Sequence, residues 1–532
     1  MSLRPAPPLV LLILASACGS DSPATPTCPA RCPTGQVCGS AGTCVPANSS
    51  GGRSVPLTCP QEDKPVGTSS FTAFTPGPGT TLAATSIIHQ QTYTVGQTAT
   101  FTAPQNTASL TIVEQATQAP DMVSFSFGGS RLDTDNVAVP HTVQSPDGSI
   151  TFNDVTDGLI LATTPNYYAS HSVFFFSDSP ATGTLTIPNT SAGLAIANGG
   201  TGLPAGSWSM VVSDLAWECQ TGVVLNAGDS CLAGALDSTY QVTVIAKPLD
   251  AGSGLIPMSG KLDVVVYFAT ASAGGLQLTA ATADADADLT RMKQTLTGLL
   301  GNGGISSVNV TFRDLPADVQ ASYATGVHVD QLGACAELPQ LLKHAEPGNT
   351  FNAFLVSDLI ESASTSQGST IVGIDGTIPG PASIGSTVAS GAAVSVADLR
   401  HKSNTTSCGA GVSYQGCGAD ETAYIIAHEA GHFLGLYHVT EQFGAEFDAL
   451  LDTPTCPCTV CSNTKICADP AQGTPPTSAD TMTVSECLPG QLGAKSTCGG
   501  GDNLMFWLFG AQSQGKLTAE QGQVIRANPL VH

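Results

Sequence analysis

Charged side chains are scarce in this chain, and positive ones are the scarcest. Asp, Glu, Lys and Arg make up 11% of the 532 residues, whereas an average protein has about a quarter. Lys and Arg together number 17, and the net charge is −24. Binding to nucleic acid or to an anionic membrane surface relies on clustered Lys and Arg. The composition therefore argues against both kinds of partner.

Long apolar runs are missing as well. Residues 9–17 are apolar but too few to span a bilayer, and no later run is long enough. We interpret residues 1–18 as an export signal. Their end resembles a bacterial lipoprotein signal in which Cys18 would be lipidated; an ordinary cleaved secretory signal is the alternative. We expect an exported bacterial protein, extracellular or on the outer cell surface, with a lipid anchor as its sole membrane attachment.

Cysteine, in contrast, is plentiful. The chain has 17 cysteines, a number that favours an oxidising compartment and disulfide bonds. Residues 19–60 are predicted to be a linker with a small module too short to build an apolar core, so disulfides would have to stabilise it. A zinc knuckle is the alternative there. The four cysteines concerned are Cys28, Cys32, Cys38 and Cys44.

Residues 65–250 are predicted to form an all-β domain. Short stretches alternate apolar and polar residues between turn residues, without a long helical period. Strands are expected at 99–102, 123–127, 172–176, 183–187 and 207–212. This pattern indicates a β-sandwich or jelly roll, which could serve as an accessory domain, a removable pro-domain or a passive spacer. Cys219 and Cys231 are expected to pair.

Residues 260–532 have an α/β pattern in their first half. Strands are expected at 262–268, 307–312, 351–355, 369–373 and 392–397, and helices at 284–300 and 335–344. Three carboxylates, Asp284, Asp286 and Asp288, crowd the start of the first helix. Stabilisation of a helix N-terminus explains them best, and a calcium site is the alternative.

The segment 428–438 contains three of the ten histidines. His428 and His432 are four residues apart, which places both imidazoles on one face of a helix. Gly435 tolerates a positive φ, so the helix can end there and His438 can return as a third ligand. Three histidines with an open fourth position are typical of a catalytic zinc site. The alternative is a core helix with three incidental histidines.

This segment resembles the zinc motif of the metzincin metalloproteases, and its surroundings are most similar to the pappalysin-like group. The resemblance covers roughly residues 260–532. It implies that His428, His432 and His438 bind one catalytic Zn²⁺, and that Glu429 is the general base in hydrolysis of protein or peptide substrates. It also implies an α/β catalytic domain that ends in an irregular, disulfide-rich subdomain.

Three features downstream belong to the same resemblance. Met505 would be the methionine of the Met-turn, an apolar floor under the ligands. Trp507 stands where some metzincins have a tyrosine, so a mechanism that needs a phenol there is in doubt. Asp448 and Asp452 resemble an acidic segment that follows the zinc helix in pappalysin-like proteins, and they suggest Ca²⁺ as a further cofactor.

Six further cysteines are expected to form disulfides, with a second metal site at 456–461 as the alternative: Cys456, Cys458, Cys461, Cys467, Cys487 and Cys498. A capped helix is expected at 518–527.

The predicted protein is thus multidomain, with an N-terminal all-β sandwich followed by an α/β metzincin-like zinc protease domain. The predicted function is that of an exported zinc endopeptidase. An alternative is a cell-surface adhesion or binding protein with a catalytically silent protease-like domain, against which the intact Glu429 argues. A third hypothesis keeps the hydrolase and restricts it to a single processed partner.

Overall fold

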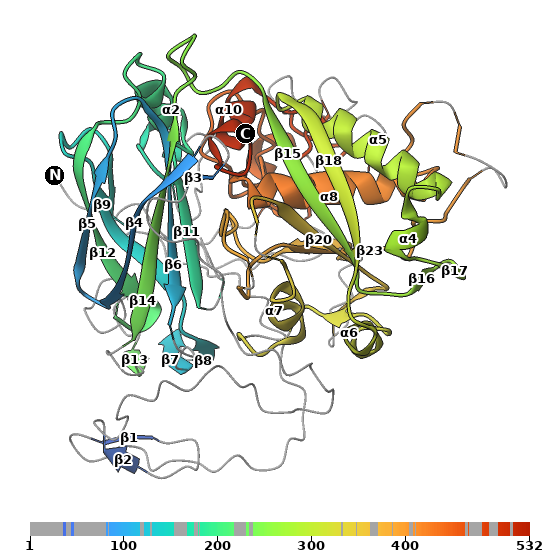
Figure 1. Ribbon diagram of the computed structural model, residues 1–532, viewed down its shortest axis with the longest axis horizontal. Coiled ribbons are helices and arrows are strands. Elements are labelled where there is room, and N and C mark those ends of the chain that lie inside the picture. The colour runs from blue at the N-terminus through green and yellow to red at the C-terminus, as the bar shows by residue number, and fades with distance from the viewer. Residues whose placement is uncertain are drawn as a thin grey trace.

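The structure is a computed structural model (Figure 1). It describes residues 36–38, 44–46, 81–82, 85–117, 122–127, 130–153, 167–174, 179, 181–217, 230–232, 238–330, 333–346, 348–361, 371–385, 387–403, 408–409, 411–462, 467, 481–488, 498–510 and 514–532. Two regions make up this part: a stack of antiparallel sheets and a mixed α/β unit. In the described residues, no helix is long and apolar enough to cross a membrane.

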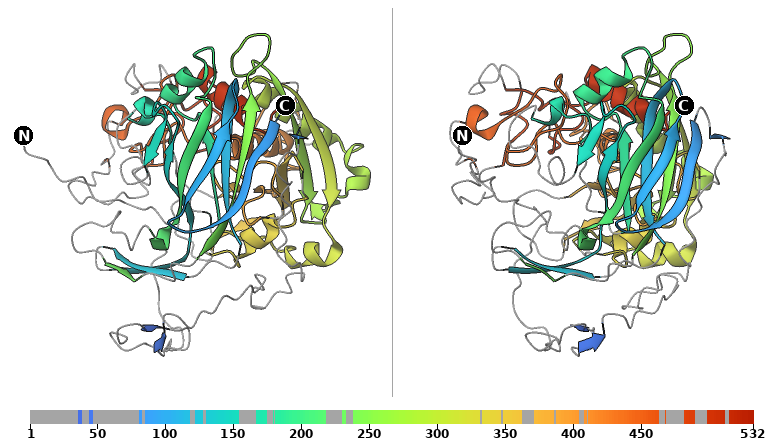
Figure 2. Two further views of the ribbon diagram at one scale, coloured as in Figure 1. Left: turned by 60° about the vertical axis from the view of Figure 1, so that its left-hand side comes forward. Right: turned by 90° about the vertical axis from the view of Figure 1, so that its left-hand side faces the viewer.

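The first region is a β-sandwich, seen from two further sides in Figure 2. One sheet has the order β10-β9-β12-β5 and the other β11-β6-β14-β4-β3, and all their pairings are antiparallel. The strands are β3 (Thr81–Leu82), β4 (Thr85–Thr94), β5 (Thr98–Ala103), β6 (Thr107–Ala116), β9 (Ala138–Gln144), β10 (Thr151–Asn153), β11 (Thr182–Ile187), β12 (Gly206–Asp214) and β14 (Thr239–Pro248). Buried side chains of both sheets, such as Phe101, Ile112 and Trp208, fill the space between them.

Shorter elements complete this region. A third sheet has the order β13-β7-β8. The helix α2 (Ser191–Ala197) begins at Thr190, whose hydroxyl accepts a hydrogen bond from the Gly193 amide. A single 3₁₀ turn, η1 (Tyr168–Ser170), lies ahead of β11 in the chain. The strands of the third sheet are β7 (Met122–Phe127), β8 (Ser130–Asp135) and β13 (Ser230–Leu232).

The second region is built on a five-stranded sheet of order β18-β15-β20-β23-β22. The first four strands are parallel and the edge strand β22 is antiparallel. Parallel strands are covered by helices on both faces, and their apolar sequences reflect this burial. The strands are β15 (Gly260–Phe268), β18 (Ile305–Asp314), β20 (Phe351–Val356), β22 (Gly373–Asp375) and β23 (Ala392–Ser395).

Helices cover this sheet on both sides (Figure 1). The long helices α5 (Ala287–Gly301) and α8 (Gly418–Phe433) pack against each other and share one core with the sandwich. The short helices α6 (Ala317–Ser322) and α7 (Glu337–Leu342) enclose a second core around Tyr267 and Phe354. Helix α10 (Ala519–Ala527) lies between the sandwich and the α/β unit, and it contacts α2.

Most predicted elements are confirmed. Expected strands at 99–102, 183–187, 207–212, 262–268, 307–312 and 351–355 lie within β5, β11, β12, β15, β18 and β20. The expected strand at 369–373 is displaced to β22. The capped helix is α10, whose Thr518 and Gln521 form a reciprocal capping box. The α/β and β-rich character of the fold is therefore as expected.

The strand expected at 172–176 is wrong in its described part. Residues 172–174 follow η1 as an irregular segment. The buried Asn189 side chain accepts a hydrogen bond from the Phe174 amide at 3.0 Å and donates one to the Phe174 carbonyl. Both backbone groups of Phe174 are thereby occupied, so the residue cannot join a sheet ladder.

Disulfides tie the chain after α8, as predicted. They join Cys456 to Cys487, Cys458 to Cys467 and Cys461 to Cys498. These pairings use every cysteine of the alternative metal site at 456–461. A further disulfide that the sequence did not suggest, between Cys408 and Cys417, closes the loop before α8.

Several sequence-based predictions fall outside the described residues. These are the export signal at 1–18 with Cys18, the pairing of Cys219 with Cys231, and the side chains of the small module. Of that module, the structure describes the antiparallel strands β1 (Gln36–Cys38) and β2 (Cys44–Pro46).

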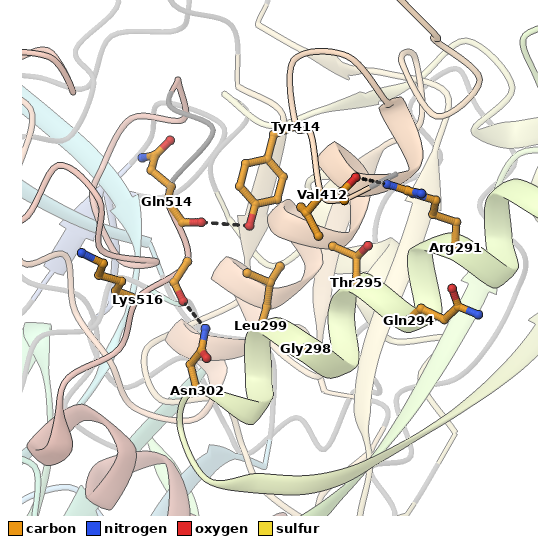
Figure 3. Close-up of a pocket in the computed structure, with 12 residues that line it drawn as sticks. Arg291, Gln294, Thr295, Gly298, Leu299, Asn302, Val412, Tyr414, Gln514 and Lys516 are labelled. Atoms are coloured by element: carbon orange, nitrogen blue, oxygen red, sulfur yellow. Dashed lines mark hydrogen bonds between the residues drawn. The ribbon is translucent and has the colours of Figure 1, made fainter. Parts of the chain in front are cut away.

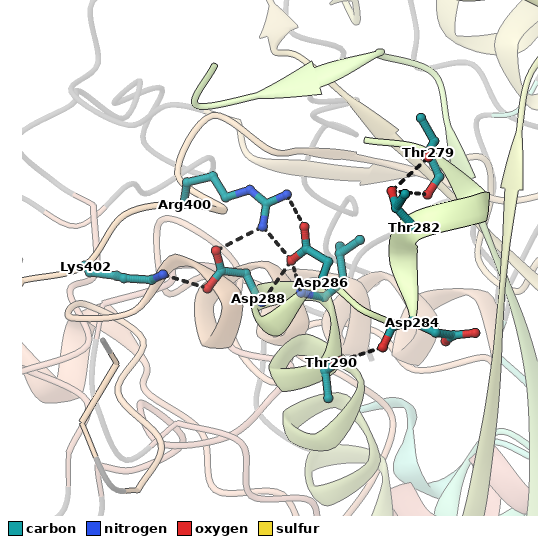
Figure 4. Close-up of polar contacts among 9 residues, drawn as sticks. Thr279, Thr282, Asp284, Asp286, Asp288, Thr290, Arg400 and Lys402 are labelled. Carbon is teal, nitrogen blue, oxygen red and sulfur yellow. Dashed lines mark hydrogen bonds and ion pairs between the residues drawn. The ribbon is translucent and has the colours of Figure 1, made fainter. Parts of the chain in front are cut away.

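The acidic start of α5 is explained without calcium (Figure 4). Asp286 caps the helix by accepting hydrogen bonds from the amides of Asp288 and Leu289. Arg400 binds Asp286 through two nitrogens at 2.6 Å each and reaches Asp288 at 3.0 Å, and Lys402 binds Asp288 at 3.0 Å. Cations of the chain itself thus neutralise this cluster.

Candidate metal centre

Helix α8 carries the candidate ligands. Asp420 and Glu421 lie in its first turn, where negative charge is favourable. Asp420 also joins the helix to α5: it accepts hydrogen bonds from Arg291 at 2.9 and 2.7 Å and from Thr295 at 2.6 Å. Burial acts to raise the pKa of Asp420, but hydrogen bonds from Arg291, Thr295 and the Ser413 amide, together with the charge of Arg291, hold the pKa below its usual value. The helix is therefore held in place by a buried charged contact.

The helix ends where the sequence predicts. Its last residue is Phe433, and Gly435 follows with φ +109°. This left-handed conformation suits glycine. It turns the chain so that His438 comes back toward the two histidines on the helix.

The three imidazoles converge on one point. The Nε2 atoms of His428 and His438 are 3.2 Å apart, and each lies 3.1 Å from the Nε2 of His432. Zinc–imidazole bonds of about 2.0–2.1 Å in a tetrahedral arrangement would place neighbouring nitrogens about 3.3 Å apart. In the described part of the chain, these side chains form the one cluster of three potential ligands. The donor set therefore fits a bound metal ion.

The Nδ1 atom of each of the three rings lies next to an oxygen that accepts a hydrogen bond. The Nδ1 of His428 lies 2.7 Å from the carbonyl oxygen of Leu504, and that of His432 lies 2.7 Å from the carbonyl oxygen of Leu436. The Nδ1 of His438 lies 2.9 Å from Oε1 of Glu441. Since a carbonyl or carboxylate oxygen can only accept, each Nδ1 carries the proton and each Nε2 presents a lone pair. Three lone pairs directed at one point repel one another unless a cation lies between them.

Burial supports the neutral state of the helix histidines. It lowers the pKa of His428 to about 3, with a further contribution from His438. Burial also lowers the pKa of His432 well below its usual value. For His438 burial acts in the same direction, but the charge and hydrogen bond of Glu441, together with the charge of Asp375, raise the pKa. The ring next to Glu441 is thus the most basic of the three.

Glu429 lies beside this cluster and is 5% exposed. Its carboxylate packs so closely on Gly373 of β22 that any side chain at position 373 would overlap Oε1. Burial, together with the charge of Asp375, raises the pKa of Glu429 well above its usual value, while a hydrogen bond from the Asp375 amide opposes the shift. A carboxylate with a raised pKa near a metal ion is suited to accept and return a proton.

Met505 packs under the helix, at the place expected for an apolar floor. It is fully buried, and a side chain at Gly431 would overlap its Sδ. The neighbouring Leu504 carbonyl binds both His428 and the Tyr424 hydroxyl. This turn therefore orients a ligand as well as filling space.

Trp507 has no role at the ligands in this structure. Its indole N–H donates to the Met482 carbonyl at 2.9 Å. A reaction at this site therefore cannot use a phenol at position 507.

Asp448 and Asp452 lie outside the histidine cluster. Asp448 is 3% exposed, and its Oδ1 accepts a hydrogen bond from Thr453 at 2.6 Å. Burial raises the pKa of Asp448 to about 8, and Asp452 and Glu520 add to the effect. The carboxylate of Asp452 accepts a hydrogen bond from the Glu520 amide. Calcium binding by these residues stays a prediction.

Sequence reasoning missed four contributors: the carbonyls of Leu504 and Leu436, and the side chains of Glu441 and Asp375. A carbonyl acceptor leaves no signal in a sequence. Glu441 is three residues beyond His438, a spacing that could have suggested a contact. Asp375 comes from an edge strand about fifty residues earlier in the chain, and only the fold brings it near Glu429.

A separate surface hollow of about 450 Å³ lies between α5 and the segments 411–414 and 514–516 (Figure 3). None of the three histidines lines it. Its polar groups hold these segments together through hydrogen bonds from Arg291 to Gly411, from Tyr414 to Gln514 and from Asn302 to Gly515. The hollow is therefore distinct from the metal centre.

A comparison with models of known protein families finds no match, and a comparison with curated proteins finds none either. The function of this protein is therefore inferred from the geometry of the site.

Proposed function

We propose that this protein is an exported zinc-dependent endopeptidase. The observation that carries the proposal is the convergence of three Nε2 lone pairs, with Nδ1 of each ring bound to an oxygen acceptor, next to the buried Glu429. A structural zinc site would have four protein ligands, whereas a catalytic one keeps a position open. The resemblance to metzincin proteases points in the same direction.

His428, His432 and His438 would hold the ion. Bound Zn²⁺ supplies Lewis-acid chemistry: it lowers the pKa of a water molecule to about 7 and stabilises negative charge on a carbonyl oxygen. Glu429 accepts the proton of the attacking water and then returns a proton to the amine that leaves. Glu441 and the carbonyls of Leu504 and Leu436 keep the three rings in their orientation.

The neighbourhood of Glu429 suits an extended peptide. Strand β22 is the outermost strand of its sheet in the described residues, and its Gly373 packs on Glu429. An edge strand presents backbone groups to which a peptide can add as a further strand. The proposed substrate is therefore a protein or peptide in extended conformation.

Export to an oxidising compartment accounts for the four described disulfides, three of which tie the segment between the ligands and Met505. We propose an extracellular or outer-surface location, with Cys18 as the residue that would carry a lipid anchor.

The test is metal content together with metal-dependent cleavage. Purified protein should contain one zinc per chain, and it should cleave a mixed peptide library in a reaction that a chelator abolishes and zinc restores. Folded protein that does not bind zinc would contradict the proposal and favour the adhesion alternative. A zinc-loaded protein that cleaves neither the library nor secreted proteins would contradict the peptidase assignment.

A further inference from the structure

We propose that the β-sandwich is a permanent part of the metal centre, which positions the loop of His438 through contacts of Tyr168 and Phe174 with Tyr437. It would then not be a pro-segment removed on activation. The inference rests on the proposed metal site, and its test is independent of peptidase activity.

The contact between the two regions is aromatic. The ring of Phe174 lies 4.6 Å from that of Tyr437, centroid to centroid, at an interplanar angle of 72°. Tyr168 packs on Phe174 at 4.9 Å. Tyr168, Phe174, Tyr437 and Ala449 are all buried and form a small core of their own, with Ile378 packed against it. Such edge-to-face pairs fix geometry as well as bury apolar area.

Tyr437 directly precedes the ligand His438. Its hydroxyl donates to the Ile378 carbonyl at 3.3 Å. Phe174 on one side and Ile378 on the other therefore limit where the backbone of His438 can lie. The sandwich sets the position of the third ligand without touching the metal.

The sandwich segment that bears these rings is itself rigidly held. Asn189 binds both backbone groups of Phe174. The Thr190 hydroxyl donates to the His171 carbonyl at 2.6 Å, and Ser172 exchanges hydrogen bonds with the backbone of Thr151. A segment fixed in this way can transmit the position of the sandwich to Tyr437.

A set of buried hydrogen bonds from Lys247 and Ser109, called the Lys247 joint below, attaches the sandwich to the α/β unit. Lys247 of β14 is 2% exposed, and its ammonium donates to the carbonyls of Arg526, Asn528 and Val531. The Ser109 hydroxyl donates to the Ala527 carbonyl at 2.5 Å. If the sandwich left, these carbonyls at the end of α10 would lose their donors, which is costly for groups that stay buried.

A second set of hydrogen bonds between the two regions involves α2. Ser191, the first residue of α2, donates to Glu520 at 2.5 Å and accepts from the Leu451 amide at 2.7 Å. Asn198 at the other end of α2 donates to Gln523 at 2.7 Å. The two regions also share one apolar core. A removable segment would be expected to meet its enzyme through a surface that is stable after removal. Here the contact instead consists of a shared apolar core and buried hydrogen bonds.

The sandwich does not seal the site either. With the sandwich in place, the side chain of His438 is still 22% exposed. Removal of the sandwich is therefore not needed to admit a ligand.

The first test uses Co²⁺, whose visible spectrum reports the geometry of its ligands, in the full-length protein. Phe174→Ala should lower the affinity for Co²⁺ at least about tenfold, as loss of a ligand-orienting contact does, and change the spectrum. Phe174→Leu should restore much of both. The matched control is Phe101→Ala, which removes an equally buried ring of the sandwich core that packs on Trp208 and should leave the spectrum unchanged. A folded Phe174→Ala protein with unaltered affinity and spectrum would overturn the positioning role.

The second test does not depend on a destabilising variant. A specific protease site is inserted in the exposed turn 251–253, which follows β14. After cleavage, the two fragments should stay together on gel filtration under native conditions and keep the cobalt spectrum. Separation of the native fragments would refute permanence. Absence of peptidase activity in a protein that passes both tests would refute the proposed function and leave this inference standing.

Discussion

Two acidic clusters of this molecule differ in what balances their charge. At the start of α5, Asp286 and Asp288 are bound by Arg400 and Lys402. Burial acts to raise the pKa of Asp286, but Arg400 and the amides of Leu289 and Asp288 together hold it below its usual value. Around the histidines, the pKa values of Glu429 and Glu446 are raised instead, that of Glu446 to about 7, by burial and by neighbouring carboxylates.

The difference separates a structural cluster from a chemical one. A carboxylate that is paired with an arginine gives up its reactivity and fixes two elements relative to each other. A buried carboxylate beside another carboxylate retains affinity for a proton or a cation. A metal ion bound by the three histidines would add positive charge beside these carboxylates.

The largest effect is expected at Glu429. Glu429→Gln removes the proposed general base and keeps the shape of the side chain, so kcat/KM should fall by about 10²- to 10⁴-fold. Zinc content, measured by mass spectrometry of the metal, should remain one per chain. Substantial activity in the zinc-loaded variant would exclude Glu429 as the base.

The structural cluster should respond in stability alone. Arg400→Met leaves two carboxylates without their main partner, and we expect the free energy of unfolding to drop by about 3 kcal/mol. Lys402→Met is the matched control: its side chain is 28% exposed, and its loss should cost about 1 kcal/mol or less. Denaturant titration measures both. A change of zinc affinity in Arg400→Met would show that the two clusters are coupled.

Glu441 should respond in metal affinity alone. Glu441→Gln replaces the charged acceptor at Nδ1 of His438 by a neutral one, which should weaken zinc binding about tenfold. Competition with a chromogenic chelator measures this affinity. Glu446→Gln, a change at a neighbouring carboxylate that binds none of the ligands, is the control. Equal effects of both changes would mean that net charge matters and the hydrogen bond does not.

The last comparison concerns pH dependence and is tested in metal-free protein. Because the pKa of Asp286 is lowered on folding, its contribution to stability is present above the unfolded value of about 3.9 and is lost as the pH falls through the lower folded value.

Asp448 should behave in the opposite way, since its pKa rises to about 8 on folding. Its contribution is present below the unfolded value of about 3.9 and is lost as the pH rises toward 8. Asp286→Asn should remove the loss of unfolding free energy at acid pH, and Asp448→Asn should remove the loss between about pH 4 and pH 8. Parallel pH profiles of the two variants would contradict the assigned shifts.

What the sequence predicts best is local. The spacing of His428 and His432 specifies one helix face, and Gly435 specifies the turn that follows. Both predictions use only the periodicity of a helix and the conformational freedom of glycine. Buried parallel strands such as β15 and β20 can also be predicted, because most of their residues are apolar.

What the sequence does not predict depends on the fold. Asp375 and Leu504 reach the centre from segments far from α8. Phe174 sits in an apolar run that has the pattern of a strand, yet Asn189 removes it from any sheet. The spacing of the cysteines alone could not distinguish the Cys408–Cys417 disulfide from the other pairings that are possible in a chain with many cysteines.

The Lys247 joint also bears on the order in which the protein folds. The residues that accept its hydrogen bonds follow it by 279, 281 and 284 positions. Contacts over such separations form slowly, since a long loop must close first. The sandwich is synthesised first, but the hydrogen bonds of Lys247 can form only after α10 has been synthesised. We therefore expect the two regions to be joined late in folding.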